Sequence, residues 1–225
     1  MLVNWNSFND TNSLEEKLLL YIGSSLRISI KENNEALILL SGGLNSISLY
    51  KRFSEIKKID WSKVKFGLVN ERWTSDNTSI SNFHNISNAL GKEIVEKSSV
   101  IPLIFDNDNE QNNFSLAKSF NSPFLDEKTI VILNLGQKGQ VASLFPSDEK
   151  SEKAISQISP NIFSTTLSEK SISHNLKSIL NTKNIILHVK GDDNKLILNK
   201  AKKQLLPVSY ILNSISTQVE IYWTK

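Results

Sequence analysis

The chain alternates short apolar runs with longer segments in which apolar residues recur every three or four positions. The short runs are rich in Val, Ile and Leu, which is typical of strands in a parallel sheet that is covered on both faces. The pattern predicts five such strands and a sixth candidate, Ile162–Thr166. The five are Ala36–Leu40, Val64–Val69, Ile130–Leu135, Ile185–Val189 and Val219–Trp223.

The longer segments have the spacing of amphipathic helices. Between Leu14 and Ile30 the apolar side chains fall on one stripe, and Asn12 or Ser13 is the expected N-cap. Further helices are expected at Ser48–Ile56, at Ile80–Leu90 with Gly91 as its C-cap, at Ile172–Leu180 and at Leu196–Leu206, and a polar loop at Asp106–Asn113.

Alternating strands and helices predict an α/β fold, a three-layer αβα domain around a mainly parallel, Rossmann-like sheet. We expect residues 1–225 to form a single domain, because a chain of this length buries one substantial core and shows no linker-like composition or internal repeat. In such sheets ligands bind beyond the carboxyl ends of the strands.

Composition narrows the function classes. No apolar run is long enough to span a bilayer, and the N-terminus lacks the basic start and apolar centre of a secretory signal. The chain has no cysteine, which excludes disulfides, a thiolate nucleophile and cysteine-ligated zinc. We therefore expect a cytoplasmic protein with no membrane partner, either a monomer or a small homo-oligomer.

The charge pattern is that of an ordinary solvated surface. The net charge of +3 comes from 26 basic and 23 acidic residues that are mixed along the chain, with Lys200, Lys202 and Lys203 as the densest basic cluster. A nucleic-acid-binding protein usually concentrates its basic residues on one stripe, so no nucleic acid partner is expected. No spacing of His, Asp and Glu suggests a metal site.

Two glycine-containing turns follow predicted strands. Ser41-Gly42-Gly43 lies between the strand Ala36–Leu40 and a predicted helix, where glycines let backbone N–H groups approach an anion. A tight turn that needs glycine only for its backbone conformation explains the same residues equally well. The second turn contains Gly136 and Gly139 and follows the strand that ends at Leu135.

The three histidines have different expected environments. His188 lies inside a predicted strand and should be packed in the core. His174 falls off the apolar stripe of its predicted helix and should be exposed. His84 follows Ser81-Asn82 and is the histidine nearest to a candidate site element, although a catalytic role is the less favoured interpretation.

Residues 131–146 resemble the signature of the 6-phosphogluconolactonases, Leu-Gly-x-Gly-x-Asp-Gly-His-Thr-Ala-Ser-Leu-Phe-Pro. The frame around Gly136 and Gly139 is kept. Lys138 stands where the family has Asp, and Gln140 stands where the family has its catalytic His. The resemblance therefore implies the family fold, that of sugar-phosphate isomerases and lactonases, with altered residues at the catalytic positions.

The resemblance extends to the phosphate-binding motifs. The turn at Ser41-Gly42-Gly43 resembles the family's Ser-Gly-Gly-Ser-Thr-Pro, in which Asn45 is here the only polar substitute for the hydroxyl residues. Asn70-Glu71-Arg72-Trp73 is similar to the family's Asp-Glu-Arg-Trp, and Arg72 is the expected phosphate ligand because guanidinium binds tetrahedral anions bidentately. A surface pair of Arg72 with Glu71 or Asp76 is the alternative.

Two further positions depart from the family pattern. Lys195 resembles the family lysine that neutralises the substrate phosphate, but it falls one residue late after Gly191. Ile162 stands where the family has an Arg. Both differences imply fewer cations around a bound phosphate.

The resemblance implies hydrolysis of 6-phosphoglucono-δ-lactone to 6-phosphogluconate in the pentose phosphate pathway, with a phosphorylated sugar or sugar lactone as ligand and no cofactor. Because Gln140 cannot accept a proton, reduced activity is expected unless Lys138 or His84 replaces the missing base. Two alternatives remain open. One is a non-catalytic sugar-phosphate-binding or interaction protein, and the other is an isomerase of the glucosamine-6-phosphate deaminase type.

Overall fold

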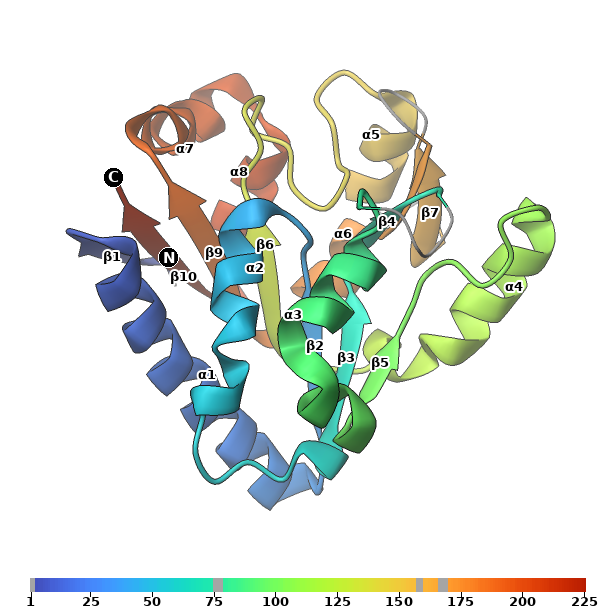
Figure 1. The fold of residues 1–225 in the computed structure, drawn as a ribbon. Helices are drawn as coiled ribbons and strands as arrows, with labels where there is room; N and C mark the ends of the chain where they lie inside the picture. Colours follow the sequence, from blue (N-terminus) through green and yellow to red (C-terminus); the bar gives the residue numbers. More distant parts are fainter. Residues whose placement is uncertain (1–2, 75–78, 157–159, 166–169) are drawn as a thin grey trace.

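The computed structural model describes residues 3–74, 79–156, 160–165 and 170–225 (Figure 1). Asp76 and Thr166, which entered the sequence-based expectations, lie outside these ranges, as does the side chain of Asn45. The elements below lie within the described ranges.

The fold is organised around a sheet of seven parallel strands in the order β1-β10-β9-β6-β2-β3-β5 (Figure 1). This confirms the predicted α/β class and its parallel sheet. The strands are β1 (Val3–Phe8), β2 (Ala36–Leu40), β3 (Val64–Leu68), β5 (Ser99–Ile101), β6 (Lys128–Asn134), β9 (Thr182–Lys190) and β10 (Gln218–Thr224).

Three further strands form a small separate sheet in the order β4-β8-β7, with antiparallel pairing. They are β4 (Asn70–Arg72), β7 (Ile162–Thr165) and β8 (Ser171–His174). The sixth expected strand is therefore present, but it does not belong to the parallel sheet.

The helix predicted at Ile172–Leu180 is wrong in its first half. Residues 171–174 form β8, and helix α6 (Leu176–Leu180) begins only after Asn175, whose side chain accepts the Ser178 N–H and caps the helix. His174, expected to be exposed, is instead fully buried. The apolar spacing from Ile172 to Ile179 imitates one helix although a capping residue divides it.

The helices cover both faces of the large sheet. Along β2 the side chains alternate, so that Ile38 and Leu40 pack in one apolar cluster and Leu37 and Leu39 in the other. Helices α1, α2 and α3 contribute to the first cluster and α5 to α8 to the second, which gives the three predicted layers. The helices are α1 (Thr11–Asn33), α2 (Leu44–Lys51), α3 (Asn82–Lys97), α4 (Glu110–Phe120), α5 (Glu149–Ile155), α6, α7 (Asp192–Gln204) and α8 (Pro207–Leu212), with short 3₁₀ turns at Phe53–Glu55, Trp61–Lys63 and Ser122–Leu125.

Several predicted helix boundaries are corrected. Helix α1 is capped by Asp10 rather than by Asn12 or Ser13. Helix α2 begins at Leu44 and ends at Lys51, so it starts and stops earlier than the predicted helix Ser48–Ile56. Helix α7 begins at Asp192, four residues before the predicted start.

Helices α3 and α4 also differ from the expected pattern. Helix α3 begins at Asn82, after Ile80, and continues to Lys97 across a kink at Gly91, whose φ is +78°. The backbone at Gly91 is not helical, so α3 consists of two helical segments that meet at the residue expected to end the first one. The expected polar loop at Asp106–Asn113 is helical from Glu110. Asn113 is buried, and its side chain accepts Phe105 N–H and donates to Leu103 C=O.

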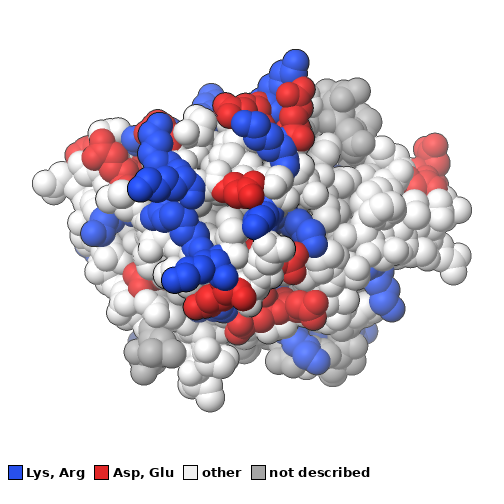
Figure 2. All heavy atoms as spheres, turned by 90° about the horizontal axis from the view of Figure 1, so that it is seen from below, with Lys and Arg blue, Asp and Glu red and all other residues white. Residues whose placement is uncertain are grey.

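Charged side chains of both signs are interspersed on the surface seen from below (Figure 2). This mixture agrees with the even charge pattern of the sequence, and the absence of a nucleic acid partner stays a prediction. None of the described helices combines the length and the apolar character that crossing a membrane requires.

Candidate active site

A cavity of about 480 Å³ lies at the carboxyl-terminal edge of the parallel sheet. It is lined by the turn after β2, by β4, by the loop between β6 and α5, and by Ser171 at the start of β8. The cavity brings together five of the predicted site residues, which are Ser41, Gly42, Arg72, Gly136 and Gln140.

The turn after β2 is tightly packed. A Cβ atom on Gly42 would lie 1.8 Å from Asn82 Oδ1, and Gly43 adopts a φ of +119°. The Ser41 carbonyl accepts the Tyr50 hydroxyl at 2.9 Å. These contacts require glycine at both positions and fix the turn at the start of α2.

A series of hydrogen-bonded side chains connects this turn to the sheet. Asn134, at the end of β6, donates from Nδ2 to Gly42 C=O at 2.6 Å, and its Oδ1 accepts the Ser46 hydroxyl at 2.6 Å. His188 Nδ1 lies 3.5 Å from Ser46 Oγ. Because Ser46 uses its proton on Asn134, its oxygen faces His188 as an acceptor.

His188 is buried, as predicted, and burial lowers its pKa to about 4. It is therefore neutral at physiological pH and contributes a hydrogen bond rather than a charge. Asn134 lines the cavity but was not identified from the sequence. Its position at the end of a predicted strand, beside the signature, was the available signal.

Strand β4 presents Arg72 to the cavity while its neighbour Glu71 points into the protein. The Glu71 carboxylate accepts the backbone N–H groups of Asn82 and Phe83 at 2.7 and 2.6 Å. It also accepts Arg72 N–H at 2.8 Å and the Ser81 hydroxyl at 3.2 Å. Burial raises the pKa of Glu71, and these hydrogen bonds act in the opposite direction.

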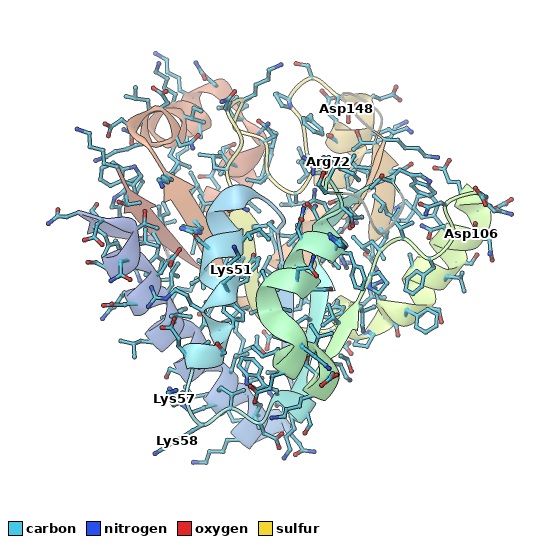
Figure 3. All side chains as sticks on the ribbon, viewed as in Figure 1. Lys51, Lys57, Lys58, Arg72, Asp106 and Asp148 are labelled. Atoms are coloured by element: carbon cyan, nitrogen blue, oxygen red, sulfur yellow. The ribbon has the colours of Figure 1, made fainter. Side chains whose placement is uncertain are left out.

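Glu71 therefore caps the amino terminus of α3 and fixes the backbone of Arg72. Arg72 is exposed, and its Nη1 donates to Ile80 C=O at 2.9 Å. Figure 3 labels Arg72 on β4 and Asp148 at the start of α5, both in the upper part of the view. Asp148 accepts Ser151 N–H at 2.8 Å and caps α5, so its carboxylate serves that helix.

The loop after β6 folds back on itself. Gly136 N–H donates to Gln140 C=O, and Gly139 N–H donates to Gly136 C=O, both at 2.9 Å. Gly136 faces the Gln140 side chain, since an added Cβ would lie 2.2 Å from Gln140 Cδ. Gly139 has a φ of +73° and packs against Leu206. Lys138 is exposed at the turn.

Beyond Gln140 the same loop contains two residues with left-handed backbone. Ala142 and Ser143 have φ values of +53° and +54°. The Ser173 hydroxyl donates to Ala142 C=O at 2.5 Å, and Asn70 Nδ2 donates to Ser143 Oγ at 2.9 Å. Ser143 lines the cavity, and sequence reasoning did not select it.

The remaining predicted residues are placed elsewhere. Lys195 Nζ lies 4.0 Å from the ring centroid of Trp223 and 5.9 Å from that of Trp5, and Lys195 is not among the residues that line the cavity. His84 Nε2 lies 2.9 Å from Asn88 Nδ2 on the same helix. Neither residue is brought to the cavity by this structure.

The described residues that line the cavity include polar and apolar groups, and one of them carries a charge. Arg72 is the only described lining residue with a charged side chain, and the other polar groups are amides and hydroxyls, among them Asn70, Asn134 and Gln140. Such a lining suits an anion with many oxygen atoms. In the part of the chain that the structure describes, no three His, Cys, Asp or Glu side chains gather as metal ligands.

Comparisons with known proteins agree with this geometry. The sequence profile of the glucosamine-6-phosphate isomerases/6-phosphogluconolactonase family matches residues 9–223. The chain is 24% identical to a 6-phosphogluconolactonase of Rhizobium meliloti, covering 99% of both chains, and 27% identical to a probable 6-phosphogluconolactonase of Dictyostelium discoideum, covering 87% of this chain and 85% of the other.

Its fold is similar to the crystal structure of a 6-phosphogluconolactonase from Shewanella baltica, with a TM-score of 0.90, 24% identity and coverage of 99% and 98% of the two chains. The profile match spans nearly the whole chain, including every element that lines the cavity. The chain therefore belongs to the family of glucosamine-6-phosphate isomerases and 6-phosphogluconolactonases.

Proposed function

We propose that the protein binds 6-phosphogluconolactone and its product 6-phosphogluconate in the cavity at the carboxyl edge of the sheet, and that it hydrolyses the lactone slowly. The observation that carries this proposal is the meeting of Arg72, the Ser41-Gly42 turn and the loop of Gln140 around one cavity. Arg72 and the backbone N–H groups of the turn suit a phosphate.

Slow hydrolysis follows from the chemistry at Gln140. Opening a lactone needs a base that deprotonates water and an acid that protonates the departing ring oxygen, and one histidine performs both transfers. The Gln140 amide donates and accepts hydrogen bonds but takes up no proton. Loss of general base catalysis lowers a rate by about 10²–10⁴-fold, while substrate binding and oxyanion stabilisation remain.

The test is a hydrolysis assay with freshly prepared lactone, in which the spontaneous opening in water is subtracted. We expect a rate above this background and well below that of a lactonase with the signature His. In parallel, calorimetry should detect binding of 6-phosphogluconate. Failure to bind 6-phosphogluconate would refute the proposal, and a rate equal to that of ordinary lactonases would refute its catalytic part.

A second candidate is a sugar-phosphate-binding protein without catalysis, which the neutral lining around Gln140 favours. It predicts binding of 6-phosphogluconate with no rate above background. The isomerase-deaminase activity is less favoured, because that branch needs an acid where this cavity has Phe145. Release of ammonia from glucosamine 6-phosphate would establish it.

A further inference from the structure

Ser143 is held at the cavity in a backbone conformation that L-amino acids rarely adopt. Its φ of +54° and the +53° of Ala142 make two consecutive left-handed residues, neither of them glycine. Each such residue costs about 1–2 kcal/mol, so it persists only where the surrounding structure fixes it. Here the Ser173 hydroxyl fixes the turn through its hydrogen bond to Ala142 C=O at 2.5 Å.

The direction of one hydrogen bond leaves the Ser143 proton available. Asn70 Nδ2 donates to Ser143 Oγ at 2.9 Å, so the serine oxygen acts as the acceptor in that contact. A hydroxyl carries one proton and two lone pairs, and it can therefore accept from Asn70 and still donate elsewhere. Among the residues that the structure describes, no acceptor receives the Ser143 proton.

We propose that Ser143 is a ligand-binding residue, and that Asn70 sets the direction in which its hydroxyl donates. The inference rests on the proposed function and adds to it a specific contact. The hydroxyl donates to an acceptor oxygen of the phosphorylated sugar acid or lactone, from the same loop that contains Gln140. The constrained backbone at Ser143 holds the hydroxyl in place before the ligand arrives.

The first test removes the hydroxyl and measures the affinity for 6-phosphogluconate by calorimetry. Ser143→Ala should weaken binding by about tenfold, near the upper end of the effect of losing an ordinary hydrogen bond. Ser143→Gly should weaken binding equally while raising the melting temperature, because glycine relieves the positive φ. A loss of affinity accompanied by a gain of stability is not explained by unfolding.

Ser147 provides a matched control. It is a serine of the same loop with a φ of +59°, but it is exposed and does not line the cavity. Ser147→Ala should leave the affinity for 6-phosphogluconate unchanged.

The second test reverses the hydrogen bond. In Asn70→Asp the new carboxylate only accepts, so it takes the Ser143 proton and withdraws it from the ligand. The added negative charge weakens binding by itself, and the informative quantity is therefore the further effect of Ser143→Ala in that background. We expect that effect to fall from about tenfold to less than twofold, which a double-mutant cycle measures directly.

The outcomes separate the two proposals. A wild-type protein that binds 6-phosphogluconate with an affinity unaffected by Ser143→Ala overturns this inference and leaves the proposed function intact. An equal effect of Ser143→Ala with Asn and with Asp at position 70 overturns the role of Asn70. A wild-type protein that binds neither 6-phosphogluconate nor inorganic phosphate overturns the proposed function and this inference together.

Discussion

The side-chain oxygen of Gln140 accepts the backbone N–H of Lys138 at 2.8 Å, so a hydrogen bond joins the residues at the two altered signature positions. Gln140 thereby closes its own loop, and the same residue accepts Gly136 N–H through its backbone carbonyl. The Gln140 side chain therefore stabilises the loop, and its amide takes up no proton.

Restoring the signature should therefore require both positions. We expect Lys138→Asp combined with Gln140→His to raise the rate of lactone hydrolysis, because the imidazole regains proton transfer and the carboxylate orients it. Gln140→His alone should raise the rate less, because no carboxylate at position 138 then orients the imidazole and sets its tautomer. Background-subtracted rates of the three proteins check this order.

A double variant that stays as slow as the wild type, while still binding 6-phosphogluconate, would contradict the assignment of position 140. Lys138→Asp alone is the control for the charge change. It should leave the rate low because Gln140 remains.

Arg72 is expected to provide most of the electrostatic binding of the phosphate. It is the only charged residue among the described residues that line the cavity. Arg72→Ala should weaken phosphosugar binding by about 1.5–3 kcal/mol, the range for a hydrogen bond to a charged group. Arg72→Lys should recover part of the loss, because lysine keeps the charge but lacks the planar fork that binds two phosphate oxygens.

Calorimetry with 6-phosphogluconate measures both variants. Lys195→Ala is a useful comparison, because the Lys195 ammonium lies over Trp223 instead of at the cavity. Equal affinities in the wild type and in Arg72→Ala would show that the phosphate binds elsewhere.

Gly42→Ala should disturb the site more than its small size suggests. The new methyl group would lie 1.8 Å from Asn82 Oδ1, and Asn82 Nδ2 donates to Asn70 C=O at 2.8 Å. Moving Asn82 would therefore shift β4 relative to the turn. We expect a loss of about 1–3 kcal/mol in unfolding free energy, which is typical of overpacking, together with weaker ligand binding.

Gly91→Ala is the matched control for stability without a site effect. Gly91 has a φ of +78° with no atom within 4 Å of an added Cβ, so alanine there strains only the backbone of α3. Urea unfolding should show destabilisation of both variants, and calorimetry should show weaker binding only for Gly42→Ala. Unchanged binding in Gly42→Ala would argue against the turn as part of the site.

The parallel sheet was predictable because buried central strands consist largely of consecutive apolar residues. All five residues of β2 are buried, and they appear in the sequence as an uninterrupted apolar run. Edge strand β1 was missed because it reads Val-Asn-Trp-Asn-Ser-Phe and is only half-buried. Strand β8 was mistaken for a helix because the apolar residues from Ile172 into α6 recur with helical spacing.

The candidate site could be predicted only where a candidate binding residue comes soon after a predicted strand. Gly42 and Arg72 do so, and the cavity brings them together. The chain of Ser46, Asn134 and His188 joins residues that are 88 and 142 positions apart, a relation that no local pattern contains. The available proton of Ser143 depends in the same way on Asn70, which is 73 positions away.

His174 should make the protein sensitive to acid. Burial, together with the nearby Lys128 ammonium, lowers the pKa of His174 to about 3, and its Nδ1 lies 2.8 Å from Ser178 Oγ. In the unfolded chain the pKa is about 6.5, so the unfolded state binds more protons between pH 6.5 and pH 3. The stability due to neutral His174 is complete above pH 6.5 and decreases as the pH falls toward 3.

His174→Asn cannot titrate, and its amide can keep the contact with Ser178. The variant should be less stable than the wild type at pH 7, and the difference in unfolding free energy should shrink by about 3 kcal/mol at pH 4. Urea unfolding at a series of pH values gives this difference directly. His188, whose pKa is about 4, destabilises both proteins in acid and cancels in the comparison. If the unfolding free energies of the wild type and of His174→Asn change in parallel between pH 7 and pH 4, His174 does not titrate as its burial requires. His84→Asn is the control for replacing a histidine outside the core.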